Sequence, residues 1–268
     1  MIDILWAFII GSIEGVTEFL PISSTGHILL VKDFLGLTAE DGFTNLYTVI
    51  IQVAAVLAVI PLFKTRIGAM LQWKDPESKD LFFKTAIAFG ITGFVGLVAK
   101  KLGLELPDSA LPIAWALFIG GLLFILLEKR IDSSKAHSSI TWTIVFVAAL
   151  GQIIAMIFPG ASRSGSTIIF MLLVGLNRER ATEFSFLIGI PTMLAAGGYE
   201  LYDALSSGGW GNENISFLLL SSLFSAITAF ISVKWLLGYI KNHTFIGFGY
   251  YRIGLALLLF GLIFMNIL

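Results

Sequence analysis

The sequence predicts an all-α protein that crosses a membrane several times, and two observations support this prediction. Hydrophobic residues make up 57% of the chain and charged residues only 13%, with a mean hydropathy of +0.90, whereas a soluble domain has about 25% charged residues. Apolar runs of about twenty residues, the length that crosses a bilayer core, recur from end to end. We therefore expect one membrane domain over residues 1–268 and no soluble domain.

The first expected element is a hydrophobic region at residues 1–36, which PISSTG interrupts at 21–26. Its first ten residues contain no Lys or Arg. A signal peptide would begin with basic residues and end at a small-residue cleavage site, so we expect this N-terminus to be retained. The chain has no cysteine, which excludes a thiol nucleophile, thiolate metal ligands and disulfides.

Six continuous spans and a second interrupted region follow. The spans are expected near 45–63, 84–99, 111–128, 184–200, 215–238 and 246–268, and PGASRSG at 159–165 interrupts the apolar region 141–176. Each interruption is a proline followed by a Ser/Thr-rich turn that glycine closes. The order is an interrupted pair and three spans, then the same again. This order predicts a duplication with halves of about 1–130 and 131–268.

The second half should be inverted relative to the first, because each half crosses an odd number of times if its interrupted pair is re-entrant. Basic residues agree with this topology, since cytoplasmic segments carry most Lys and Arg. Lys32, Lys100 and Lys101 fall in outer segments, Arg163 in the second interruption and Arg252 within the last span; the other twelve of the seventeen fall in cytoplasmic segments. Each half is thus expected to be a re-entrant helix hairpin plus three transmembrane helices, with both termini outside.

The two interruptions predict an anion site. Non-helical backbone at membrane depth is tolerated only where it is buried in protein or lines a wet cavity, so the interruptions should meet near the midplane. A helix restarts after each one and directs its free N–H groups and positive dipole end into that cavity. The glycines and hydroxyls suited to such a site are Gly26, Gly160, Gly165, Ser23, Ser24, Thr25, Ser162, Ser164 and Ser166.

Three charged side chains in these regions suit phosphate. Arg163 is costly at bilayer depth and its guanidinium fits bidentate contact with phosphate; the alternative is an arginine that snorkels to an interface. Glu14 and Glu18 lie four apart on one helix face, where a divalent cation, Mg²⁺ or Ca²⁺, would relieve their repulsion and bridge to phosphate. Protonation of a carboxylate, or pairing with Arg163, would also relieve it.

Ser24 and His27 lie three apart, so a helix that restarts at Ser23 places both on one face of its first turn. There His27 could activate Ser24 as a nucleophile, or act itself as nucleophile or general acid. The alternative is a helix-capping serine beside a buried histidine. The set of nucleophile, base, cation ligands and phosphate clamp predicts phosphoryl chemistry in a membrane cavity.

The segments EGVTEFLPISSTGH at 14–27 and PGASRSGST at 159–167 resemble the two signature motifs of the bacterial undecaprenyl-diphosphate phosphatase, or bacitracin-resistance, family. IIQVAAVLAV at 51–60, EFSFLIGIP at 183–191 and the order of spans also match, so the resemblance covers essentially the whole chain. It implies hydrolysis of undecaprenyl diphosphate to undecaprenyl phosphate and inorganic phosphate, which recycles the lipid carrier for cell-wall synthesis. It also implies the bacterial inner (plasma) membrane and a site open to its outer, periplasmic side.

The resemblance places the family's acidic pair on Glu14 and Glu18, its serine and histidine on Ser24 and His27, and its arginine on Arg163. The expected catalytic residues are Ser24, His27, Glu18 and Arg163; the expected phosphate ligands are Ser23, Thr25, Gly26, Ser162, Arg163, Ser164 and Gly165; the expected cation ligands are Glu14 and Glu18. Ser24 is favoured as the nucleophile, with His27 as its base. Polyprenyl diphosphate and membrane lipids are the expected partners, without nucleic acid and with a homodimer left open.

Two other classes of function remain alternatives. A polyprenyl-phosphate transporter or flippase would also use broken helices that meet at the midplane of an inverted repeat. Transport would not require His27 beside Ser24. A structural membrane subunit without chemistry would leave Glu14, Glu18 and Arg163 unexplained at high energetic cost.

Overall fold

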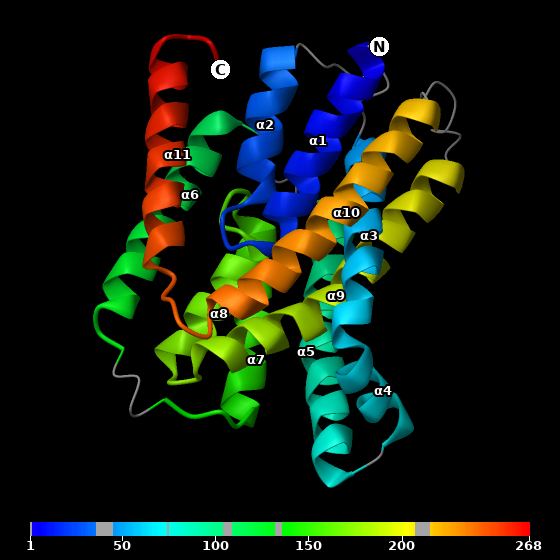
Figure 1. The fold of residues 1–268 in the computed structure, drawn as a ribbon, viewed down its shortest axis with the longest axis vertical. Coiled ribbons are helices and arrows are strands. Elements are labelled where there is room, and N and C mark those ends of the chain that lie inside the picture. The colour runs from blue at the N-terminus through cyan, green and yellow to red at the C-terminus, as the bar shows by residue number, and fades with distance from the viewer. Residues whose placement is uncertain (1, 36–44, 74, 104–108, 132–135, 207–214) are drawn as a thin grey trace.

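The computed structural model describes residues 2–35, 45–73, 75–103, 109–131, 136–206 and 215–268, and within these ranges the chain is almost entirely helical (Figure 1). The elements are α1 (Ile2–Phe19), α2 (Ser24–Leu35), α3 (Asn45–Val59), the 3₁₀ turn η2 (Ile60–Phe63), α4 (Lys64–Gln72), α5 (Pro76–Lys101), α6 (Ala110–Glu128), α7 (Trp142–Ile157), α8 (Arg163–Leu173), α9 (Arg178–Ser206), α10 (Ile215–Tyr239) and α11 (Ile246–Phe264).

Six helical segments in the described part of the chain are long and apolar enough to cross a bilayer. They are Tyr47–Gln72, Pro76–Lys101, Ala110–Glu128, Arg178–Ser206, Ile215–Tyr239 and Ile246–Phe264. Each contains or overlaps one of the six predicted spans, so the prediction of an all-α multi-pass membrane protein is confirmed. The helices α5 and α9 begin earlier than the predicted spans because their first turns are polar: Asp75 caps α5 by accepting the Ser78 N–H at 2.8 Å.

Both predicted interruptions break a helix. The first break separates α1 from α2, and the second separates α7 from α8. In each break the residue before the new helix is a serine with left-handed backbone, φ 74° at Ser23 and 67° at Ser162. Each serine Oγ accepts the N–H of the glycine three residues on, Gly26 at 3.4 Å and Gly165 at 3.2 Å. Ser23 is therefore a cap, and the predicted restart at Ser23 is corrected to Ser24.

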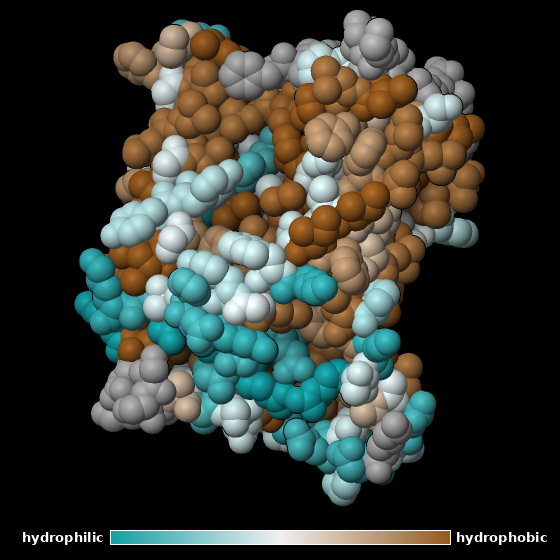
Figure 2. Space-filling model, viewed as in Figure 1, coloured by the Kyte–Doolittle hydropathy of each residue, from teal (hydrophilic) through white to brown (hydrophobic). Residues whose placement is uncertain are grey.

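The two hairpins approach each other from opposite ends of the molecule. The N- and C-termini lie at one end together with α1 and α2, whereas α7 and α8 lie toward the other end (Figure 1). Hydrophilic side chains gather at the end away from the termini, and hydrophobic side chains cover most of the remaining visible face (Figure 2). Exposed lysines and arginines at helix ends include Lys64, Lys79, Lys129, Arg130 and Lys241. The inverted relation between the halves remains a prediction.

Close helix packing keeps the first hairpin in place. The helix α1 packs along α10, and Gly11 and Gly15 lie directly against the α10 backbone at Ser221 and Ser225, so that an added Cβ atom would collide with those carbonyls. Small residues at such contacts are typical of membrane helices, which associate by close packing rather than by the hydrophobic effect.

Candidate functional site between the two helix breaks

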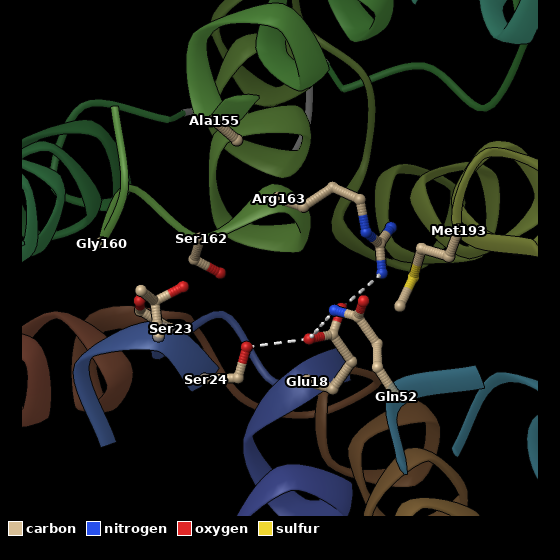
Figure 3. Close-up of a pocket in the computed structure, with 10 residues that line it drawn as sticks. Glu18, Ser23, Ser24, Gln52, Ala155, Gly160, Ser162, Arg163 and Met193 are labelled. Atoms are coloured by element: carbon tan, nitrogen blue, oxygen red, sulfur yellow. Dashed lines mark hydrogen bonds and ion pairs between the residues drawn. The ribbon is translucent and has the colours of Figure 1, made fainter. Parts of the chain in front are cut away.

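A cavity of about 140 Å³ lies where the two breaks meet (Figure 3). Ser23, Ser24 and Thr25 line it from the first break, and Gly160, Ser162 and Arg163 from the second; Glu18, Gln52, Ala155 and Met193 complete the wall. The predicted meeting of the two breaks in one cavity is confirmed. Its depth in a bilayer stays a prediction.

The beginnings of α2 and α8 supply polar backbone to this cavity. A helix leaves its first N–H groups without intrahelical partners, and the positive end of its dipole favours an anion there. Ser24 and Thr25 open α2, and Arg163 opens α8. Two such helix starts at one cavity suit an anion, and the binding of an anion there stays a prediction.

The Glu18 carboxylate, on α1, contacts one side chain from each of α2, α3 and α8 at the centre of this site (Figure 3). Its Oε2 accepts the hydroxyl of Ser24 at 2.8 Å and the Gln52 Nε2 at 3.0 Å. Its Oε1 lies 3.6 Å from Nη2 of Arg163, and the Glu18 side chain is only 5% exposed. A carboxylate with these three neighbours can hold Ser24 and Arg163 in a fixed relation to each other.

Arg163 keeps donors for a ligand. Its Nη1 donates to the backbone oxygen of Ser185 at 3.3 Å. Its Nη2 faces Glu18 at 3.6 Å without a hydrogen bond, and its buried Nε has no hydrogen-bond partner among the described residues. An unpaired buried donor is costly, and a guanidinium binds phosphate through two parallel N–H groups. Gly189 leaves room for the guanidinium, since an added Cβ atom there would collide with it. Arg163 thus lines the cavity with a buried side chain and does not snorkel outward; its role as a phosphate clamp stays a prediction.

Glu14 lies one turn before Glu18 and is 1% exposed, but it does not line the cavity. The two carboxyl groups lie four residues apart, on one face of α1. The Oε1 of Glu14 has no partner among the described residues. Of the two alternatives to a cation, the structure shows an ion pair between Glu18 and Arg163; protonation of a carboxylate and binding of a cation stay predictions.

The expected contact between His27 and Ser24 is wrong. The His27 Nδ1 lies 2.6 Å from the Ser23 carbonyl oxygen and its Nε2 lies 2.7 Å from the Tyr251 hydroxyl, and the His27 and Tyr251 rings stack. Because the helix starts at Ser24, the imidazole reaches back to the carbonyl one turn earlier. The Ser24 hydroxyl turns to Glu18 instead. His27 does not line the cavity, and it contacts the first break through the Ser23 carbonyl.

The remaining predicted phosphate ligands fall into two groups. Ser23, Thr25, Ser162 and Arg163 line the cavity, whereas Gly26, Ser164 and Gly165 do not. Ser164 is fully buried, and its Oγ donates to the Leu20 carbonyl at 3.2 Å, which ties the second break to the first. The two glycines supply the capped N–H groups described above. Gly26, Ser164 and Gly165 thus stabilise the two breaks, and the other four residues line the cavity from those breaks.

Sequence reasoning missed two residues near the site. Gln52 lines the cavity and bonds Glu18, and its signal was present: it is the one polar residue of the apolar run IIQVAAVLAV. Tyr251 contacts His27 although 224 positions separate them. Its signal was weaker, since a tyrosine in a membrane helix has many ordinary positions.

The fold and the site define a class: a multi-pass membrane protein with two helix starts, an arginine and an acidic group at one internal anion site. Residues 7–258 match the family described as bacitracin resistance protein BacA, and the chain belongs to this family. It is 47% identical over 262 residues to a Rhizobium etli protein named undecaprenyl-diphosphatase, with 97% of each chain covered. A protein of the same name from Xylella fastidiosa is 41% identical over 261 residues, 97% of this chain and 98% of that one.

Proposed function

We infer that this chain is an integral membrane phosphatase that hydrolyses undecaprenyl diphosphate to undecaprenyl phosphate and inorganic phosphate, and so recycles the lipid carrier for cell-wall synthesis. One observation carries the chemistry: Ser24 donates to Glu18 at 2.8 Å at the same cavity wall where Arg163 has unpaired donors. A hydroxyl with an adjacent base and a facing guanidinium is suited to attack on phosphorus. The relatives named undecaprenyl-diphosphatase support the substrate.

We propose that Ser24 is the nucleophile and that Glu18, rather than His27, accepts its proton. The Ser24 oxygen attacks the terminal phosphorus, the bond to the bridging oxygen breaks, and undecaprenyl phosphate leaves. A water then hydrolyses the phosphoserine and releases inorganic phosphate, which restores the Ser24 hydroxyl. Arg163 and the first N–H groups of α2 and α8 stabilise the charge on the phosphoryl oxygens. His27 holds the first break through the Ser23 carbonyl.

A divalent cation, Mg²⁺ or Ca²⁺, remains part of this proposal. No group of three His, Asp or Glu side chains in the described ranges could hold a metal by itself. The unpartnered Glu14 Oε1 and the Glu18 carboxylate are nevertheless hard oxygen donors of the kind such ions prefer. When bound there with substrate oxygens, the ion would neutralise charge on the transferred phosphate.

The membrane topology is proposed on charge. We place the charged end of the molecule in the cytoplasm and both termini outside, in the inner (plasma) membrane of a bacterium, because cytoplasmic loops collect Lys and Arg. The hydrophilic end away from the termini supports this orientation (Figure 2). We also propose, as the resemblance implies, that the active site is accessible from the outer, periplasmic side.

An inverted repeat is also proposed. In such a repeat, α1, α2, α3, α5 and α6 of the first half correspond in order to α7, α8, α9, α10 and α11 of the second. The contact of α1 with α10 then has a counterpart in the contact of α7 with α5. The contact of α3 with α10 has a counterpart in the contact of α9 with α5. The pairs α3 with α9 and α6 with α11 exchange into themselves and also pack. The shared left-handed serine caps support the same correspondence.

Phosphate release from undecaprenyl diphosphate by the purified chain in detergent tests the function. We expect release by the parental protein and its loss on chelation of divalent cations. Arg163→Lys should be badly impaired, because an ammonium cannot reproduce a bidentate fork. Arg180→Lys, at a basic residue remote from the cavity, is the matched control. Movement of the lipid across vesicles without phosphate release would instead favour a flippase.

A further inference from the structure

Arg252, in α11, is the largest fully buried side chain of the described chain and lines no part of the cavity. Its Nε donates to the Leu117 carbonyl at 3.4 Å. Its Nη1 donates to Pro21 at 3.3 Å and Ala161 at 3.0 Å, and its Nη2 to Ala116 at 3.0 Å and Gly160 at 3.3 Å. A guanidinium has five N–H groups, so each of them has one carbonyl oxygen.

Three of these carbonyls belong to the two helix breaks. Pro21 lies in the first break, and Gly160 and Ala161 lie in the second, so one side chain bonds both. The other two carbonyls belong to α6. Arg252 thus fixes the breaks relative to each other and relative to a membrane-spanning helix.

The position is built for a guanidinium. An added Cβ at Gly120 would collide with the Arg252 guanidinium, and an added Cβ at Gly165 would lie 3.1 Å from its Nη1. Gly121 packs in the same way against the neighbouring α11 backbone at Gly249. A lysine would leave part of this space and most of these acceptors unused, because its single ammonium has three donors.

The charge of Arg252 is uncompensated. Arg163 pairs with Glu18 at 3.6 Å, and the part-buried Arg178 pairs with Glu128 at 2.5 Å. No carboxylate in the described ranges forms an ion pair with Arg252. A buried cation without a counter-ion is expensive, and such residues at membrane depth mark functional sites.

The contacts with Ala161 and Gly160 reach the cavity wall through the backbone. In a trans peptide unit the N–H points opposite to the C=O, so the bond from Arg252 to the Ala161 carbonyl also sets the direction of the Ser162 N–H. Gly160 and Ser162 both line the cavity. Arg252 therefore acts on the cavity without touching it.

We propose that Arg252 is a positioning residue for the phosphate site. It holds the two breaks so that Ser24 of one and Arg163 of the other meet the same phosphoryl group. Its positive charge, which lies outside the cavity on the far side of Gly160 and Ser162, also strengthens the binding of an anion in the cavity. The statement about the phosphoryl group rests on the proposed phosphatase function. The statement about anion binding does not.

The experiment measures three quantities for each purified variant: turnover and KM for undecaprenyl diphosphate, the dissociation constant for inorganic diphosphate by calorimetry, and the melting temperature in detergent. Arg252→Met removes both charge and bonds, so we expect at least a tenfold loss of kcat and at least a tenfold weaker diphosphate affinity. Arg252→Lys keeps the charge but not the five bonds, so we expect the kcat loss with an affinity within about threefold of the parental value.

Two further variants keep the test decisive. Arg178→Met removes an arginine outside the cavity and should lower the melting temperature while kcat per folded molecule and diphosphate affinity stay parental. Gly120→Ala retains Arg252 but displaces its guanidinium; it serves where Arg252→Met does not fold, and it should lower kcat at least tenfold.

The proposal is overturned if the Arg252 and Gly120 variants keep parental kcat and diphosphate affinity per folded molecule, as a purely structural arginine would. Failure of the phosphatase function gives a different result, since the parental chain would then bind diphosphate without releasing phosphate. In that case the affinities of the parental chain and of Arg252→Met still decide whether Arg252 supports an anion site.

Discussion

Glu18 connects the proposed nucleophile to the proposed clamp, since it accepts the Ser24 hydroxyl and pairs with Arg163. Glu14 does not line the cavity. The two carboxylates are four residues apart and look alike in the sequence, yet the structure gives them different neighbours. They should therefore respond differently to substitution.

We expect Glu18→Gln to lower kcat by about a hundredfold or more, the range for loss of a positioned base. Glu14→Gln should lower it less and shift the divalent-cation titration, because it removes one proposed oxygen ligand. Turnover measured against cation concentration checks both. Equal losses with unchanged titrations would show that the carboxylates act together in structure and bind no cation.

Ser24→Ala should reduce turnover by orders of magnitude while inorganic diphosphate still binds, because the attacking oxygen is lost but Arg163 and the helix starts remain. Tyr251→Phe keeps the ring stacked on His27 and removes only the hydroxyl, so we expect a loss of a few-fold. If Ser24→Ala keeps more than about a tenth of parental turnover, a barrier change under about 1.4 kcal/mol, another nucleophile must be sought.

The sequence predicted that Ser24 and Arg163 would meet at one cavity, which the structure shows, but it could not predict their hydrogen-bond partners. Spacing along one helix suggested that His27 would face Ser24, and that inference ignored the carbonyl at Ser23, which the imidazole reaches more easily. Gln52 and Arg252 were given no part in the site because their contacts join segments far apart in the chain. Contacts of this kind depend on packing, which no local pattern reports.

At the scale of elements, the two serine caps are the most distinctive feature. Ser23 and Ser162 hold left-handed backbone, which costs a non-glycine residue about 1 kcal/mol or more, and each caps the helix that follows. The strain persists because both turns are held by the bonds of Arg252 and Ser164.

Substitution at Ser162 should separate strain from chemistry. Glycine relieves the positive φ and is nearly as good a cap, so Ser162→Gly should melt within a few degrees of the parental protein; Ser162→Ala keeps the strain and loses the cap, at a cost of about 1 kcal/mol. Both remove the hydroxyl from the cavity. Equal loss of activity in a stable Gly variant and a less stable Ala variant would assign the hydroxyl to substrate binding.

Hydropathy and turn residues predicted which elements exist, and they placed both breaks at the correct motifs. They misjudged helix starts such as Pro76 and Arg178, because polar first turns belong to the helix but not to the apolar run. They also gave no sign that α1 packs along α10, where glycines meet the partner backbone.

At the scale of the whole molecule, orientation in the membrane is the open test. The chain lacks cysteine, so single cysteines report cleanly. We expect Ser206→Cys, at the end of α9, to react with an impermeant thiol reagent added outside intact cells, and Lys241→Cys, after α10, to react only after the membrane is opened. Both positions are exposed. The reverse pattern would invert the proposed topology.

The shared location of the two termini has a consequence for connectivity (Figure 1). Chain ends on the same face of a membrane can be joined by a flexible linker, and the chain can then be reopened elsewhere, which domains tolerate when the new opening lies at the surface. Reopening between α6 and α7 would exchange the order of the two halves and move both new ends to the opposite face. Because each half supplies one wall of the cavity, such a circular permutant should still fold and release phosphate. Activity of such a permutant would show that the chemistry does not depend on the order of the two halves along the chain.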